Sequence, residues 1–262
     1  TRLLSWFTII KRVLKIRGGH LIRKICAVIC ILFLLGIPLV SAQTIQFSYD
    51  ANGNLLSGID RQYEYNGYNQ LVKVKSVNGV VLEEYAYDHE GNRIKKVEYF
   101  SNGKKQSTYY PSKNLVEIVN DSGTFDEYYI YDGDTLVAKK DVNGKMLYYH
   151  PDHLGSTSLV TDEQGKVVEE TSYLPFGGVV SGGKERFLYN GKEKDSSGLL
   201  YYGARYYDPV VKKFTQPDTI IQDVYDPQSL NRYSYVRNNP YTYVDRDGHI
   251  WDIFADIAFM KW

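Results

Sequence analysis

The sequence predicts an all-β protein built as a series of β-hairpins. Segments such as residues 70–75 and 83–87 alternate apolar and polar side chains, which is typical of strands with one buried and one wet face. Asn-Gly pairs separate several of these segments, and 22 glycines allow many turns. Tyrosine occurs 25 times, and its ring suits pleated, half-buried surfaces. Together these observations indicate many short strands.

Residues 1–42 differ from the rest of the chain in charge and hydropathy. They hold seven Lys and Arg and no acidic residue, and an uncharged run over residues 25–40 follows Arg23 and Lys24. Three small residues then precede Gln43, as they do at a signal-peptidase site. We therefore expect a secretory signal peptide. An uncleaved membrane anchor through residues 25–40 and a buried core helix are the alternatives.

The remaining charge and the cysteines narrow the functional classes. Both cysteines, Cys26 and Cys30, lie within the apolar run, so a cleaved chain would depend on packing rather than on disulfides. Beyond residue 42 there are 24 basic and 31 acidic residues, and such a body does not attract phosphate backbones. We expect no nucleic-acid partner, and export through the inner membrane to a secreted or cell-envelope location.

Residues 43–147 carry an internal repeat. Four tyrosines recur at intervals of 22 residues: Tyr65, Tyr87, Tyr109 and Tyr131. The Asn-Gly pairs between them favour type I′ hairpin turns, in which both turn residues have positive φ. Each repeat is then about one hairpin, which cannot bury its apolar face alone, so neighbouring hairpins must pack together. A generic β-meander with coincidental tyrosines is the alternative.

Residues 148–248 contain no helical pattern of useful length, but they carry a dense series of motifs. The motifs are, in order, Tyr149 to Thr157, Tyr173 to Gly177, Asn190 to Asp195, Gly198 to Tyr202, Ala204 to Pro209, Phe214 to Asp218, Asn231 to Val236, Asn238 to Pro240 and Asp245 to Gly248. In this order they resemble the core domain associated with Rhs or YD repeats, and with the upstream repeats the resemblance covers residues 47–248.

This resemblance implies an architecture and a set of partners. In bacterial polymorphic toxins, in toxin-complex C subunits and in teneurin-type shells, a spiral of YD-repeat hairpins forms a hollow β-shell. The core domain plugs one end and separates the scaffold from a variable C-terminal segment, often a toxin. The partners implied are a C-terminal toxin cargo or the remaining shell repeats, together with an immunity protein or a cell-surface glycan.

The resemblance also implies a site for cutting the chain. Family cores can cleave themselves just past the last motif by an aspartyl-type reaction, and by motif position the residues are Arg205, Asp218 and Asp245, with Asp247 as an alternative to the last. Two carboxylates that lie close together repel each other when both are ionised, so one keeps a proton while the other activates water. A guanidinium would orient the charged one. Cleavage would fall near residues 249–250.

The sequence departs from the family at these positions. The family has Asp-Pro at both aspartates, whereas Thr219 and Arg246 follow them here, so the proline-fixed backbone is missing. Lys212 and Lys213 replace Gly-Arg, and His249 replaces a leucine. The alternative for both acids is a structural role in turns and ion pairs.

Two further groups of residues are expected to be structural, and neither a metal nor a cofactor is predicted. His150 and His153 flank Asp152 in a Pro-containing loop without an evident third ligand, so we expect a turn held by side-chain hydrogen bonds. An aromatic group could form a sugar-binding platform, but core packing is the more frequent role of such rings. Its members are Tyr201, Tyr202, Tyr206 and Tyr207.

Residues 249–262 form the tail, where Ile250, Ile253, Phe254, Ile257 and Ala258 have the spacing of a short amphipathic helix. Fourteen residues are too few to form a toxin domain. We therefore interpret the chain as an exported scaffold fragment. It is either a displaced cassette, meaning a scaffold end that has lost its cargo, or a piece of a longer gene. A single-turnover aspartyl-type autoprotease and a surface carbohydrate-binding or adhesion module are the rival functions.

Overall fold

The computed structural model describes residues 46–221 and 224–249, together with the backbone of residues 251–253. The chain divides into a first unit, Thr1–Thr44, and a second, Ile45–Trp262, and the fold described below belongs to the second. The predicted signal or anchor segment lies outside the described residues. Within the described ranges, no helix is both long and apolar enough to cross a membrane.

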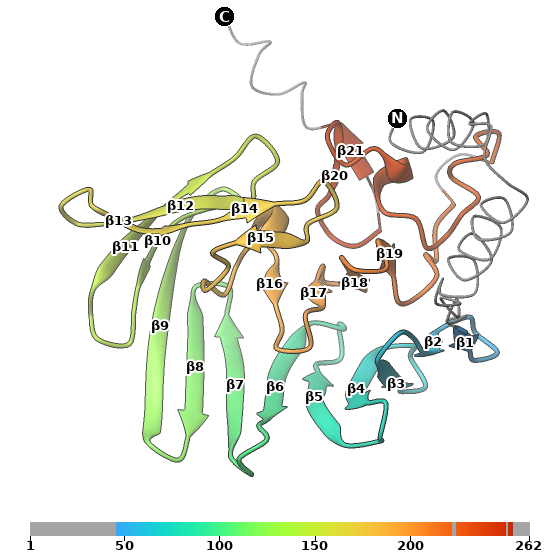
Figure 1. Ribbon diagram of the computed structural model, residues 1–262, viewed down its shortest axis with the longest axis horizontal. Helices are drawn as coiled ribbons and strands as arrows, with labels where there is room; N and C mark the ends of the chain where they lie inside the picture. The colour runs from blue at the N-terminus through green and yellow to red at the C-terminus, as the bar shows by residue number, and fades with distance from the viewer. Residues whose placement is uncertain (1–45, 222–223, 250, 254–262) are drawn as a thin grey trace, which may run out of the picture. The chain divides into compact units, whose positions relative to one another are not determined.

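One antiparallel sheet of 13 strands dominates this unit, and its strands follow one another in sequence order (Figure 1). The predicted all-β class is thus confirmed. Its strands are β1 (Ser48–Tyr49), β2 (Leu55–Ser57), β3 (Arg61–Tyr65), β4 (Leu71–Ser76), β5 (Val81–Tyr87), β6 (Arg93–Tyr99), β7 (Lys105–Ser112), β8 (Leu115–Asn120), β9 (Gly123–Asp132), β10 (Thr135–Lys140), β11 (Met146–Pro151), β12 (Thr157–Asp162) and β13 (Val167–Glu170).

The Asn-Gly turns between these strands share one geometry, which differs from the predicted type I′ turn. At the β4–β5 turn the Gly79 amide donates to the Ser76 carbonyl at 2.9 Å, and the Ser76 amide donates to the Val80 carbonyl at 2.8 Å. Gly79 has a φ of +81°, whereas Asn78 is not among the residues with positive φ. The loop therefore contains three residues, a type I turn followed by a left-handed glycine, and the prediction of type I′ turns was wrong.

The tyrosine repeat corresponds to one hairpin per period, with one correction. Tyr65 and Tyr87 end β3 and β5, and Tyr131 is the last residue but one of β9. All three pack against buried clusters on one face of the sheet, which we call the inner face. In β7 it is Tyr110 that packs inward, while Tyr109 lies opposite Lys95 on the other face. The pairing of β7 with β8 shifts beyond Tyr109, so the third repeat is offset by one residue despite the even spacing.

The remaining elements form smaller sheets beside the large one. Their bounds are β14 (Ser172–Tyr173), β15 (Val179–Ser181), η1 (Tyr189–Gly191), β16 (Glu193–Lys194), β17 (Leu200–Tyr201), β18 (Tyr206–Asp208), β19 (Lys213–Phe214), η2 (Val236–Asn238), β20 (Tyr243–Asp245) and β21 (Trp251–Ile253). Strands β16 to β19 form a four-stranded antiparallel sheet, and β14–β15 and β20–β21 are hairpins. We call residues 187–218, which include β16 to β19, the core module.

The expected C-terminal helix is not formed where the structure describes the tail. Residues 251–253 are strand β21, and Asp245 of β20 pairs with Trp251. A helical spacing read over a few residues carries little weight against the hydrogen bonds that an adjacent strand offers. The rest of the predicted helix lies outside the described residues.

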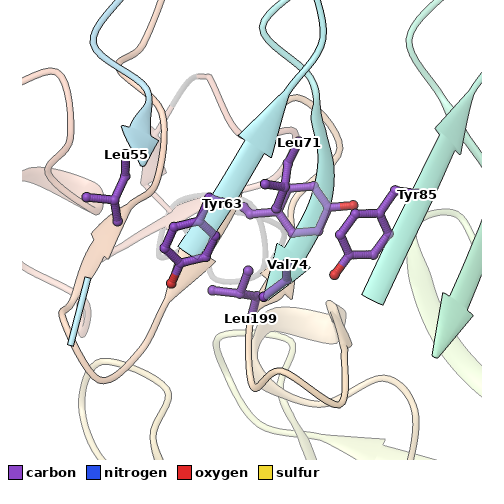
Figure 2. Close-up of a cluster of buried hydrophobic side chains, with 7 residues drawn as sticks. Leu55, Tyr63, Leu71, Val74, Tyr85 and Leu199 are labelled. Carbon is purple, nitrogen blue, oxygen red and sulfur yellow. The ribbon is translucent and has the colours of Figure 1, made fainter. Parts of the chain in front are cut away.

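The core module packs against the inner face of the large sheet. Figure 2 shows Leu71, Val74 and Tyr85, from β4 and β5, directed toward Leu199 of the module. Tyr85 also lies against Tyr206, with ring centroids 5.0 Å apart. These side chains are buried, so the contact removes apolar surface from water on both partners. The sheet and the module therefore share one hydrophobic core.

Candidate functional site

Arg205 lies between β17 and β18, where the module meets the β20–β21 hairpin. The amide of Ala204 donates to the Asp247 carbonyl at 3.0 Å, which joins the two segments. The Arg205 guanidinium stacks on Phe214, with Cζ 3.8 Å from the ring centroid, and its Nη1 donates to the Arg232 carbonyl at 3.1 Å. The side chain is only 5% exposed, so its direction is fixed by packing.

The structure brings the three predicted residues together. Nη2 of Arg205 lies 2.8 Å from Oδ2 of Asp218 and 3.4 Å from Oδ2 of Asp245. Both carboxylates are largely buried, with side chains 10% and 4% exposed. Two acids, separated by more than twenty residues in sequence, thus share one guanidinium nitrogen.

Each aspartate uses its other oxygen to hold a turn. Oδ1 of Asp218 accepts the Ile220 amide at 2.9 Å, and Oδ1 of Asp245 accepts the Gly248 amide at 2.6 Å. Asp247, the alternative to Asp245, accepts the His249 amide at 2.9 Å. The predicted structural role in turns and ion pairs is therefore present, and it leaves Oδ2 of Asp218 and Asp245 facing Arg205.

Arg232 fixes the backbone at Asp218, where the family has a proline directly after the aspartate. The Asp218 amide donates to the Arg232 carbonyl at 2.9 Å, and Nε of Arg232 donates to the Asp218 carbonyl at 2.5 Å. On the other side, Nζ of Lys192 donates to the Arg246 carbonyl at 2.6 Å. Hydrogen bonds from the rest of the chain therefore hold both aspartate segments without a proline-fixed backbone. Neither Arg232 nor Lys192 was predicted from the sequence.

Burial shifts the pKa values of two groups in the site, Asp245 and Arg205. Desolvation raises the pKa of Asp245 to about 6, and the attraction of Arg205 offsets only part of this rise. Burial also lowers the pKa of Arg205, although the two aspartates oppose that shift. At mildly acidic pH, Asp245 is therefore partly protonated while it lies beside a guanidinium and a second acid. That is the arrangement that acid–base catalysis by a carboxyl pair requires.

Two cavities adjoin the site. The smaller has a volume of about 30 Å³, is lined by Asp218, Asp245, Ser229 and His249 among others, and is large enough to admit a water molecule. The larger, of about 1110 Å³, lies between the inner face of the sheet and the module, and its lining includes Tyr87. Arg205 and His249 line both cavities.

A buried group of charges, which we call the ion cluster, joins the module to the sheet. It consists of Arg93, Lys96, Glu193 and Asp195. Arg93 lies 2.6 Å from Glu193 and 2.7 Å from Asp195, and Lys96 lies 2.8 Å from Asp195. All four side chains are at most 4% exposed. Burial alone would raise the pKa of Glu193, but Lys96, Arg93 and Arg186 outweigh it and hold that pKa well below its ordinary value.

The ion cluster escaped the sequence analysis although the repeat contained a signal for it. Leu71 and Leu115 begin β4 and β8, and Arg93 occupies the corresponding place in β6, 22 residues from each. Leu71 is fully buried, so an arginine at the matching position faces the interior. A charge at a core position of a repeat needs a buried partner. The core module supplies that partner as Glu193 and Asp195.

The two groups expected to be structural are so. Oδ1 of Asp152 accepts the amides of Leu154 at 2.9 Å and Ser156 at 2.8 Å, which confirms the predicted turn. His150 lies 3.0 Å from the Thr161 hydroxyl. The rings of the four tyrosines form core: three are buried and Tyr201 packs against the Leu199 cluster.

Comparison with known proteins identifies the same group of proteins as the sequence motifs do. The sequence profile of the teneurin YD-shell family matches residues 38–241, which is more than half of the chain. The chain belongs to the teneurin YD-shell family. Among curated YD-shell relatives, the tRNA nuclease WapA of Bacillus subtilis (strain 168) is 32% identical over 215 residues, 78% of this chain and 9% of WapA. Toxin subunit YenC1 of Yersinia entomophaga is 32% identical over 130 residues, 45% of this chain and 13% of YenC1.

The YD-shell fold is shared with solved structures. The crystal structure of TcdB2-TccC3 superposes with a TM-score of 0.66 and 27% identity, over 76% of this chain and 11% of that one. The predicted membership of the YD-repeat and Rhs group is thus confirmed. The chain spans a small part of the length of each of these relatives.

Proposed function

We propose that this chain is the plugged end of a YD-shell scaffold in an exported toxin-type protein, whose partners are further shell repeats and a C-terminal cargo. The observation that carries the proposal is the ion cluster, which seats the core module on the inner face of the sheet. Because the charges of both signs in this cluster are buried and lie in ion pairs with one another, the large sheet and the core module form one unit. The names of the relatives, a tRNA nuclease and a toxin subunit, support a cargo that differs between proteins.

A hybrid protein tests this proposal. Residues 46–248 replace the matching segment of WapA, and protease resistance is compared with that of unaltered WapA. The scaffold role predicts that the hybrid protects the rest of the chain as WapA does, and that Glu193→Lys removes the protection. A folded hybrid that is digested as fast as its Glu193→Lys variant would contradict the proposal.

We further propose that the site cuts its own chain. The convergence of Asp218 and Asp245 on Arg205 favours this second function, because it places two largely buried carboxyl groups, one of them with a raised pKa, beside a small cavity. Asp245 keeps a proton below pH about 6 and acts as the acid, and Asp218 acts as the base toward water. The reaction occurs once, since the chain is its own substrate.

The experiment is incubation of the purified 262-residue chain, followed by mass spectrometry. A fragment ending near residue 249 is expected, formed at least ten times faster at pH 5 than at pH 8, because Asp245 is protonated below about 6. Asp218→Asn should abolish it. Asp134→Asn serves as the matched control, since that carboxylate is 82% exposed and lies outside the site. A chain that stays intact at pH 5 would exclude self-cleavage.

A further inference from the structure

We infer that a single proton on Glu83 holds the core module on the large sheet, and that loss of this proton loosens the module. Glu83 lies in β5 and is fully buried where the module packs against the inner face. It takes no part in the self-cleavage proposed above. The inference adds a control by pH to the proposed scaffold, and it rests on that proposal only through the seating of the module.

Hydrogen-bond donors from the sheet and from the module converge on the Glu83 carboxyl group. Oε1 accepts the Ser197 amide at 2.8 Å and the Ser196 hydroxyl at 2.6 Å, and both of these residues belong to the module. Oε2 accepts the Tyr85 hydroxyl at 2.5 Å. A hydroxyl group can accept as well as donate, so a neutral Glu83 keeps the same partners. The carboxyl group is therefore a direct link between β5 and the module.

This carboxyl group has no positive charge to pair with. Within the described ranges, Glu83 forms no ion pair. Three other buried acids around the ion cluster each lie within 3.7 Å of Nζ of Lys96: Glu98, Glu193 and Asp195. A fully buried carboxylate without a cation is strongly unfavourable. Glu83 is therefore the acid that keeps its proton when the module is seated.

The groups that face Glu83 add to this effect. Glu98 of β6 lies directly opposite it, and like charges in that position repel each other. On β4 the residue opposite is the apolar Val74. Burial raises the pKa of Glu83, the negative charge of Asp195 raises it further, and the three hydrogen bonds offset only part of the rise.

The basic residues and the tyrosine beside Glu83 do not change charge as it ionises. Burial works against the charged forms of Arg93 and Lys96, but the attraction of the surrounding acids, Asp195 first, outweighs it and raises both pKa values well above their ordinary range. Burial likewise raises the pKa of Tyr85. Loss of the Glu83 proton therefore leaves a negative charge that no new cation neutralises.

The sign of the pH dependence follows. The folded chain keeps the Glu83 proton above the ordinary pKa of 4.5, at which the unfolded chain releases it. The stabilising contribution is therefore complete below 4.5 and is lost as pH rises through the raised pKa of the folded chain. Opening of the module admits water to the carboxylate, so ionisation favours the open form.

Hydrogen exchange of the full 262-residue chain tests the inference, with protection factors measured for residues 193–201 between pH 5 and 9. In the unmutated chain we expect protection to fall by at least about tenfold over this range. Glu83→Gln is neutral at every pH and should keep its protection throughout. Glu84→Gln is the matched control, because the neighbouring carboxylate pairs with Lys73 at 3.0 Å and is 35% exposed. It should show the same fall as the unmutated chain.

The possible results separate this inference from the proposed function. High protection that does not change with pH in the unmutated chain, or an equal fall in Glu83→Gln, would overturn the inference and leave the seating of the module standing. Rapid exchange at every pH would contradict the seating itself, and with it the scaffold role.

Infrared spectroscopy keeps the inference testable if Glu83→Gln does not fold. It is applied to Asp245→Asn, because Asp245 also titrates within this range. The carbonyl band of a protonated carboxyl group should disappear over the same pH interval in which protection falls. A band that is lost at a different pH, or that is absent at pH 5, would overturn the inference.

Discussion

At the scale of single residues, Asp218 and Asp245 show what a sequence motif predicts and what it does not. Their identity, and that of Arg205, followed from resemblance to a family motif. Their contacts did not, because Arg205 and Asp245 are 40 residues apart and meet only through the packing of β20–β21 against the module. The loss of both prolines suggested a weakened site. The hydrogen bonds between Arg232 and Asp218 compensate for one of them, and no local sequence pattern predicts that pairing.

Asp245 should make the stability of the fold depend on pH. Its pKa is raised from 3.8 to about 6 in the folded chain, so the folded state keeps a proton that the unfolded state has already released between those values. Its stabilising contribution is therefore complete below pH 3.8 and is lost as pH rises through 6. We expect a loss of about 2 to 3 kcal/mol across this window.

Urea unfolding between pH 3.5 and 7 measures this contribution. Asp245→Asn should remove this part of the pH dependence, because the amide does not titrate. Asp134→Asn, which alters an exposed carboxylate, should leave it in place. If the Asp245→Asn chain and the unmutated chain followed parallel curves, the burial of Asp245 would not have the effect described.

At the scale of elements, the hairpins were predicted correctly and their turns were not. Alternation in residues 83–87 has Glu83 and Tyr85 buried on one face, as expected for strand β5. Asn-Gly fits both a two-residue loop and a three-residue loop, and the register of the flanking strands decides between them. That register depends on the whole sheet. The same limit explains the tail, where pairing with β20 gave a strand in place of a predicted helix.

Two glycines with similar backbone angles lie in different surroundings, so substitutions at them distinguish the effect of backbone strain from that of overpacking. Gly177 and Gly79 have φ values of +84° and +81°, but a Cβ on Gly177 would lie 2.5 Å from Cδ1 of Tyr189, while one on Gly79 would meet nothing within 4 Å. The Tyr189 hydroxyl donates a hydrogen bond to the Pro175 carbonyl at 2.8 Å, so the ring cannot easily move away.

We therefore expect Gly79→Ala to reduce the free energy of unfolding by about 1 to 2 kcal/mol, from backbone strain alone. Gly177→Ala should cost about 1 to 3 kcal/mol more, because it also overpacks against Tyr189. Urea denaturation of both variants at pH 7 gives the difference. Equal losses would mean that the Tyr189 contact is not as tight as described.

At the scale of the whole folded unit, the buried charges rather than the apolar contacts specify how the module sits. Apolar side chains such as Leu199 tolerate sliding, because the hydrophobic effect has no direction. The bonds from Arg93 to Glu193 and Asp195 admit one arrangement, and a buried charge without its partner is strongly unfavourable. Composition indicated only that the body is acidic. It did not indicate that charges of both signs are buried on the inner face.

A double-mutant cycle between Arg93 and Asp195 tests the seating of the module most directly, because these residues lie 102 positions apart and meet only if the module packs as described. The free energy of unfolding is measured by urea denaturation for the unmutated chain, Arg93→Met, Asp195→Asn and the double variant. We predict a coupling energy of about 1 to 3 kcal/mol. If the losses of unfolding free energy in the two single variants add up to the loss in the double variant, the coupling energy is zero, and that result would contradict the account.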